Sequence, residues 1–174
     1  MSAPTLGSDL RRQSVTALSN ARLVFERSPV NATLAIILGF LAFRLALSLS
    51  VGLGVDESYS LANSRDLSLS YFDHPPLHLW IAHMSEVLFG AVPLARLPFV
   101  LMFAGTTWMM FRFTERLFGS AAGVWAVLAL NLTGFFTAAA GEWILPDGPL
   151  LLCLLGAAYC VAAILKPRAD DHGT

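Results

Sequence analysis

Two short clusters of ionisable side chains have the types that group-transfer chemistry at a membrane surface needs. Asp56 and Glu57 stand where a long apolar run ends, and Asp73 and His74 follow within the heptapeptide at 71–77. A carboxylate can accept a proton from an attacking hydroxyl, and an imidazole held cationic by a neighbouring carboxylate can pair with a phosphate oxygen. Charged groups at the mouth of a membrane span therefore suggest chemistry on a lipid-borne substrate.

The composition indicates an all-α membrane protein. Hydrophobic residues make up 56% of the 174 residues and charged residues 13%, and the mean hydropathy is +0.64. Soluble proteins contain about a quarter charged residues. Each of four apolar windows approaches or exceeds the roughly 17 to 25 residues that cross a hydrocarbon core. We predict four transmembrane helices, over residues 30–55, 95–114, 121–140 and 149–165.

Basic residues cluster at alternate ends of these spans, which orients the chain by the positive-inside rule. They are Arg11, Arg12, Arg22 and Arg27 before the first span, Arg112 and Arg116 at the end of the second, and Lys166 and Arg168 after the fourth. We expect a multi-pass protein of the inner (plasma) membrane, with the segments 1–29 and 166–174 in the cytoplasm. The loop 56–94 then lies on the outer face. The net charge of −1 argues against a nucleic-acid partner.

The outer loop is expected to hold two amphipathic juxtamembrane helices joined by a stiff turn. Residues 56–70 predict a short polar helix, which Asp56 would cap, and capping is the alternative explanation for this carboxylate. Residues 77–89 predict an amphipathic helix along the membrane surface. On its apolar face we expect Leu77, Trp80, Ile81, Met84 and Leu88, and turned away from that face the polar residues His78, Ser85 and Glu86. His74 precedes a proline and is not helical, so its spacing to His78 does not predict a zinc site. We name no metal ligand, and a divalent metal requirement stays open.

Arg44 and Asp147 are further candidates, each with a structural alternative. Arg44 lies in the middle of the first span, where a charge costs from roughly 3 kcal/mol upward unless it is paired. It either serves function or locks the bundle by meeting a carboxylate or carbonyl of another helix. Asp147 belongs to a second acidic loop on the same side as the first, and a helix cap is its alternative role. Arg65 and Arg96 are basic exceptions on the outer side, for which we consider a functional role.

Six short motifs follow one another in a fixed order over about a hundred residues, which together form a specific signal. They are Asp56-Glu57-Ser58-Tyr59, Tyr71 to Leu77, Leu88-Phe89-Gly90, Arg96-Leu97-Pro98, Leu117-Phe118-Gly119 and Pro146-Asp147-Gly148-Pro149-Leu150. In this order they resemble the N-terminal part of the polytopic glycosyltransferases with the C-type fold (GT-C). More narrowly, the chain is similar to bacterial relatives of the dolichyl-phosphate-mannose protein mannosyltransferases and of the lipid A aminoarabinose transferases (glycosyltransferase family 39).

The resemblance implies a cell-envelope enzyme that moves a sugar from a polyprenyl-phosphate donor to a lipid, glycan or protein acceptor. It makes Asp56 the catalytic carboxylate and Glu57 its partner, and it brings His74 near the lipid phosphate. Asp73 and Asp147 would line the same cavity. Family members often have two aromatic residues after the acidic pair, whereas this chain has Tyr59-Ser60. A sugar-stacking role for Tyr59 is therefore left open.

Our hypothesis for the chemistry is that Asp56 deprotonates the acceptor and the anomeric centre inverts. His74, with Arg44 or Arg65, would stabilise the leaving phosphate. The resemblance names no certain cofactor, and a divalent metal stays open.

The length of the chain leaves the class of protein open. Such enzymes usually carry more spans, so we expect a partial GT-C fold, from a fragment, a truncated product or a short homologue. A small non-catalytic four-helix membrane protein or an inactive truncated homologue is the alternative. The carboxylates and prolines gather in loops rather than along the spans, which disfavours a transport path.

Overall fold

Every regular element in the described part of the chain is a helix. The computed structural model describes residues 28–90 and 92–167, so the predicted cytoplasmic segments 1–29 and 166–174 lie almost wholly outside the described residues. The elements are α2 (Pro29–Ser50), α3 (Val55–Ser64), α4 (Pro76–Phe89), the 3₁₀-helix η1 (Val92–Arg96), α5 (Leu97–Phe118), α6 (Ser120–Leu132), the π-helix η2 (Phe136–Ala140) and α7 (Asp147–Leu165). The prediction of an all-α protein is confirmed.

Within residues 28–90 and 92–167, three helices are long and apolar enough to cross a membrane. They occupy Pro29–Ser50, Leu94–Phe118 and Asp147–Leu165, with mean hydropathies of 2.1, 1.4 and 2.2. Each exceeds the roughly 17 residues that a crossing requires. The chain is therefore a multi-pass membrane protein, and three of the four predicted spans correspond to these helices.

The fourth predicted span, 121–140, is interrupted. Helix α6 ends at Leu132, and Thr133 leaves the helical region with φ −76° and ψ 115°. Thr133 Oγ1 donates to the Ala129 carbonyl at 2.7 Å, a local bond that competes with helix continuation, and Gly134 adds a second weak helix former. The chain becomes helical again at Gly134 and continues as the π-helix η2. A transmembrane helix over 121–140 is therefore not confirmed, because hydropathy alone does not register this break.

Two helices lie in the loop between α2 and α5, although their bounds differ from those predicted. Helix α3 ends at Ser64 rather than Ser70, and its N-cap is Gly54, so Asp56 stands in the first turn and is not the cap. Helix α4 ends at Phe89, and its C-cap residue Gly90 adopts the left-handed region with a φ of 61°. Their position along the membrane surface stays a prediction.

Part of the apolar surface of α4 is turned away from the rest of the protein, while Leu79 and Ala82 are buried. Leu77, Met84 and Leu88 are 47%, 54% and 67% exposed, whereas His78 and Ser85 are each 1% exposed. An exposed apolar stripe of this kind is compatible with contact to lipid.

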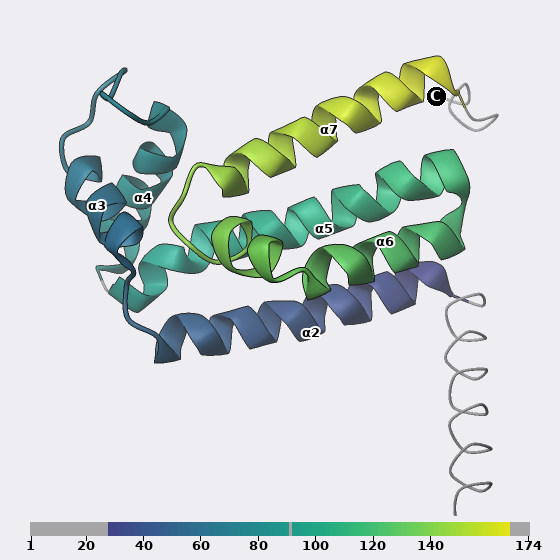
Figure 1. The fold of residues 1–174 in the computed structure, drawn as a ribbon, viewed down its shortest axis with the longest axis horizontal. Coiled ribbons are helices and arrows are strands. Elements are labelled where there is room, and N and C mark those ends of the chain that lie inside the picture. The colour runs from purple at the N-terminus through teal and green to yellow at the C-terminus, as the bar shows by residue number, and fades with distance from the viewer. Residues whose placement is uncertain (1–27, 91, 168–174) are drawn as a thin grey trace, which may run out of the picture.

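Helix α5 is the centre of the bundle. It packs against α2, α6 and α7, while α3 and α4 pack on each other. Figure 1 shows the long helices side by side, with α3 and α4 together at one end of them. At that end a core cluster joins Leu61 of α3, Ala82 of α4, Phe99 of α5 and Ile144 of the segment 141–146. This cluster fixes the helices that carry the candidate residues.

The α5–α6 hairpin depends on a close approach at Gly123. A Cβ there would lie 2.8 Å from Phe111 Cδ2 and 3.1 Å from the Phe111 carbonyl oxygen, and Phe111 is fully buried. We expect Gly123→Ala to lower the free energy of unfolding by about 1 to 2 kcal/mol, because the backbone contact must open. Thermal unfolding in detergent checks this. Gly156→Ala, where a Cβ would meet nothing within 4 Å, is the control and should leave stability equal or slightly higher.

Candidate functional site

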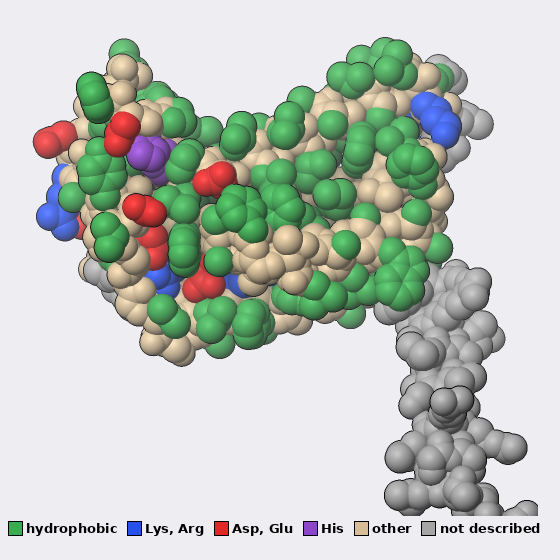
Figure 2. All heavy atoms as spheres, in the orientation of Figure 1, with side chains coloured by type: hydrophobic (Ala, Val, Ile, Leu, Met, Phe, Trp, Pro, Cys, Tyr) green, Lys and Arg blue, Asp and Glu red, His purple; other side chains and the backbone are tan. Residues whose placement is uncertain are grey.

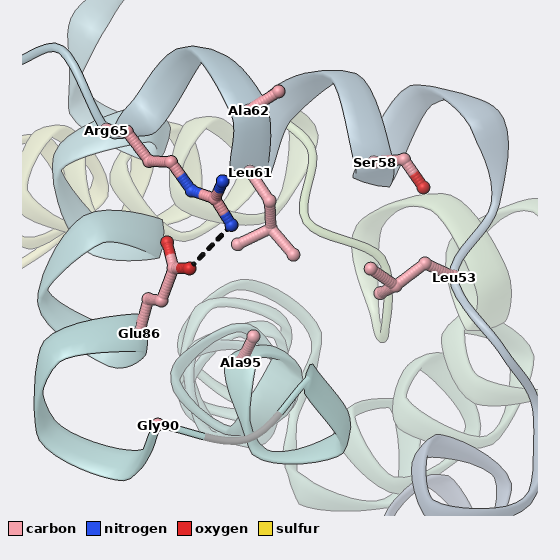
Figure 3. A pocket seen from close by; sticks show the side chains of 8 residues that line it. All are labelled: Leu53, Ser58, Leu61, Ala62, Arg65, Glu86, Gly90 and Ala95. Carbon is pink, nitrogen blue, oxygen red and sulfur yellow. Dashed lines mark hydrogen bonds and ion pairs between the residues drawn. The ribbon is translucent and has the colours of Figure 1, made fainter.

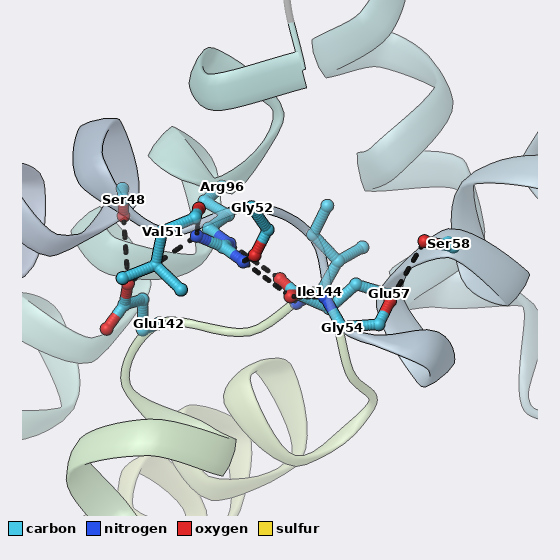
Figure 4. A network of polar contacts seen from close by, with 9 residues as sticks. All are labelled: Ser48, Val51, Gly52, Gly54, Glu57, Ser58, Arg96, Glu142 and Ile144. Carbon is cyan, nitrogen blue, oxygen red and sulfur yellow. Dashed lines mark hydrogen bonds and ion pairs between the residues drawn. The ribbon is translucent and has the colours of Figure 1, made fainter.

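Glu57 is the centre of a buried polar network. Its carboxylate, 1% exposed, receives Arg96 in two-pronged geometry, Nε to Oε1 at 2.7 Å and Nη2 to Oε2 at 2.6 Å. The backbone N–H of Gly54 donates to Oε2 at 2.9 Å, and that of Ile144 donates to Oε1 at 3.3 Å. Figure 4 shows how these residues converge from separate segments. A carboxylate that accepts four donors is fully engaged, so Glu57 has the geometry of a structural anchor.

Arg96 extends the network to the end of α2. Nη1 and Nη2 donate to the carbonyls of Val51 and Gly52, both at 2.9 Å. Nη1 also lies 3.7 Å from Oε1 of Glu142, which accepts a hydrogen bond from Ser48 Oγ at 3.4 Å. Burial raises the pKa of the Glu142 carboxyl, and the charge of Arg96 opposes that rise. The network therefore ties α2, α3, η1 and the segment 141–146 to one another.

A second, exposed cluster lies on the other side of α3. Tyr59 Oη donates to Asp73 Oδ2 at 2.9 Å, and His74 Nδ1 lies 2.9 Å from Asp73 Oδ1. The Tyr59 and His74 rings are 6.0 Å apart. Hydrogen bonds from His74 and then Tyr59 lower the pKa of the Asp73 carboxyl. The structure thus brings together three of the candidate residues, with Asp73 as an anionic link.

Asp56 is exposed on the same side. It precedes Tyr59 by three residues on α3, and side chains at this spacing share a helix face. Among the residues that the structure describes, none forms a hydrogen bond or ion pair with Asp56. Figure 2 shows acidic and histidine side chains on the walls of a hollow between the α3–α4 end and α7. Asp56 therefore has the free carboxylate that Glu57 lacks.

His78 lies near the start of α4 and Asp147 at the start of α7, and these two helix starts face each other across a groove. His78 is 1% exposed, its Nδ1 lies 3.0 Å from the Pro75 carbonyl, and its ring lies 5.4 Å from that of His74. Burial lowers the pKa of His78, while the charge of Asp147 acts in the opposite sense. A largely apolar groove of about 210 Å³ separates the two helix starts; its lining residues are Pro75, Leu77, His78, Pro146, Pro149, Leu150 and Cys153. Sequence reasoning took His78 for an outward-facing polar residue, and no sequence signal marked its burial.

The two candidate arginines lie away from the exposed cluster. Arg65 pairs with Glu86 at 3.0 Å and borders a pocket of about 190 Å³ on another face of α3 (Figure 3). Arg44 is buried within α2, where Nη1 donates to Asn131 Oδ1 at 3.0 Å and the guanidinium lies 4.4 Å from the centre of the Phe103 ring. Of the two readings left open for Arg44, these contacts agree with a residue that joins helices.

Metal ligation has little support in the described ranges. No group of three or more His, Cys, Asp or Glu side chains there is placed to hold a metal ion. What the arrangement offers is a free carboxylate beside an imidazole and a phenol, at one end of a membrane-spanning bundle. Such a set can accept a proton and can bind an anionic group.

Comparison with protein families gives one match. The model of the dolichyl-phosphate-mannose-protein mannosyltransferases matches residues 73–171, from the exposed Asp73 through α7. No curated protein and no solved structure matches the chain. Because the family match covers more than half of the sequence, the chain belongs to the dolichyl-phosphate-mannose-protein mannosyltransferase family of membrane glycosyltransferases.

Proposed function

We propose that the protein transfers a sugar from a polyprenyl-phosphate donor to a hydroxyl acceptor at the outer face of the plasma membrane. The observation that carries this proposal is the exposed, unpaired Asp56 beside the Tyr59–Asp73–His74 cluster. The acceptor is a lipid, glycan or protein hydroxyl. The lipid tail of the donor would remain in the bilayer, which suits a site at the end of apolar helices.

The reaction needs one proton transfer and one displaced phosphate. The acceptor oxygen attacks the anomeric carbon while its proton passes to the Asp56 carboxylate. The bond between that carbon and the phosphate oxygen breaks, and the lipid phosphate leaves with the bonding electrons. Phosphate is a stable leaving anion, so no strong acid is required, and attack from the opposite face inverts the anomeric centre.

The surrounding residues then have separate tasks. Protonated His74 supplies positive charge to the leaving phosphate, with its ring held by Asp73. Tyr59 lies beside it as an aromatic surface for the sugar. Glu57, held by Arg96, fixes the first turn of α3 and so directs Asp56. Asp147 faces the site from the start of α7.

The test is mannose transfer by the purified protein in lipid nanodiscs, with dolichyl-phosphate-mannose as donor. We expect His74→Ala to raise KM for the donor about tenfold, since one charge-assisted hydrogen bond to phosphate is lost. His74→Lys should restore most of the affinity because it restores the cation. Consumption of radiolabelled donor, followed at several donor concentrations, measures KM and kcat for each variant.

His83→Ala is the matched control, because His83 lies on α4 in a different groove, with Leu67, Trp80 and Met84. Its KM should equal that of the unchanged protein. Absence of donor-dependent transfer by the unchanged protein would rule out the proposed activity and favour a non-catalytic membrane protein.

A further inference from the structure

Arg44 has a buried guanidinium whose hydrogen-bonding capacity is mostly unused. Its side chain is 2% exposed within α2, and only Nη1 has a hydrogen-bond partner, Asn131. Nε and Nη2 are buried without a partner. An unpaired buried charge is costly, so an opposite charge nearby must offset it.

The segment after η2 lies directly against this guanidinium. A Cβ on Gly141 would be 2.8 Å from Arg44 Nε and 2.7 Å from the Phe136 carbonyl oxygen. The next residue, Glu142, accepts from Ser48, which lies one turn after Arg44 on α2. Glu142 is 5% exposed, and the charge of Arg44 lowers the pKa of its carboxyl. Glu142 therefore supplies the opposite charge.

We propose that Arg44 and Glu142 are coupled positioning residues, which hold the segment 141–146 against α2 and α3 and so set Asp147 in the candidate site. Arg96 pairs with both Glu57 and Glu142, whereas Arg44 acts on Glu142 through its charge and without a direct ion pair. This cluster of four charged residues reaches from the span to the first turn of α3, where Ile144 N–H meets Glu57. The coupling itself does not depend on the proposed sugar transfer, whereas its effect on turnover does.

The charged groups that face Glu142 set the sign of the pH effect. They are Arg96 from η1, Glu57 from α3 and Arg44 from α2. Burial raises the folded-state pKa of Glu142, so the stability contributed by its neutral form is present at low pH and is lost as pH rises through that pKa. Removal of Arg44 removes a cation that lowers this pKa. In Arg44→Met the pKa of Glu142 is therefore higher than in the unchanged protein, and stability continues to fall up to a higher pH.

The first experiment follows thermal unfolding of Arg44→Met against pH and needs no substrate. The deficit in melting temperature relative to the unchanged protein should grow from pH values below the ordinary range of glutamic acid toward neutrality. In a Glu142→Gln background the deficit should be independent of pH. A deficit that is equally pH-dependent in both backgrounds, or in neither, would overturn the coupling.

A second variant covers the case in which Arg44→Met fails to fold. Asn131→Asp keeps the shape of the Arg44 partner and adds a negative charge that offsets the Arg44 cation. Because the new carboxyl titrates as well, the variant is compared with and without Glu142→Gln, and the part of the pH dependence that Glu142→Gln removes should extend to higher pH. Arg112→Met removes an arginine of α5 that pairs with Glu115 at 3.3 Å outside the cluster, and it should leave the pH dependence unchanged.

The second readout is mannose transfer. Because Glu142 accepts hydrogen bonds as a carboxylate, we expect Arg44→Met to move the acid limb of kcat to higher pH. Arg44→Lys should restore it. If unfolding shows the coupling and transfer is absent even in the unchanged protein, the proposed function fails and the coupling stands. An unmoved limb in an active protein would refute the positioning role.

Discussion

Asp56→Asn is expected to lower kcat for mannose transfer about a thousandfold while the protein stays folded. An amide of nearly the same shape cannot accept the acceptor proton, and general-base catalysis contributes about 10² to 10⁴ in rate. Folding should be unaffected, because Asp56 is exposed and forms no hydrogen bond or ion pair with the residues that the structure describes. Single-turnover transfer from radiolabelled dolichyl-phosphate-mannose measures the rate, and thermal unfolding measures the stability.

Asp66→Asn is the matched control for this change. Asp66 is an exposed carboxylate of the same loop, and the contact that the structure gives it is made by its backbone carbonyl, with Tyr71. Turnover should remain within about twofold of the unchanged protein, because no catalytic or structural contact is removed. Turnover by Asp56→Asn at the rate of this control would exclude Asp56 as the base.

Arg96→Met is expected to reduce the free energy of unfolding by about 3 to 5 kcal/mol. The substitution leaves Glu57 as a buried carboxylate without its charged partner, and breaking a buried pair on one side costs about this much. It also removes the donors to the Val51 and Gly52 carbonyls. Chemical denaturation in a fixed detergent measures the loss.

Two further variants identify the cause of that loss. Arg65→Met removes an arginine that is 70% exposed and paired with Glu86, and an exposed pair is worth about 0 to 1 kcal/mol. The double variant Arg96→Met with Glu57→Met should recover part of the stability, because no buried charge remains without a partner. Equal losses for Arg96→Met and Arg65→Met would contradict the buried network.

The sequence predicted the elements better than their interior breaks. Helix α4 was predicted to within one residue, because a proline at its start and a glycine at its end both act locally. The break after Leu132 was missed, since it depends on the Thr133 hydroxyl in a stretch that is apolar throughout. The predicted cap at Asp56 was wrong. The N-cap is Gly54, two residues earlier, and its backbone N–H donates to the Glu57 side chain.

The candidate site was predictable in its residue types and less so in their pairing. Asp73 and His74 are adjacent in sequence, and their contact follows from the stiff turn. The pair of Glu57 with Arg96 spans 39 residues, and no local pattern specifies such a partner. Arg96 was noticed as a basic residue on an unexpected side, which was the available signal. Glu142 was noticed only as a member of the second acidic loop, and its partners from α2 and η1 could not be predicted from a local pattern.

The four donors around Glu57 also constrain how the polypeptide is assembled during synthesis. They lie as many as 87 positions from Glu57, and Ile144 emerges from the ribosome long after α3. Before Ile144 is made, Glu57 has the donors of Gly54 and Arg96 but lacks the fourth, so the hydrogen bonding that holds α3 in its final place is incomplete. Maturation of this region is therefore a late event in biogenesis, timed by the arrival of the polypeptide that precedes α7.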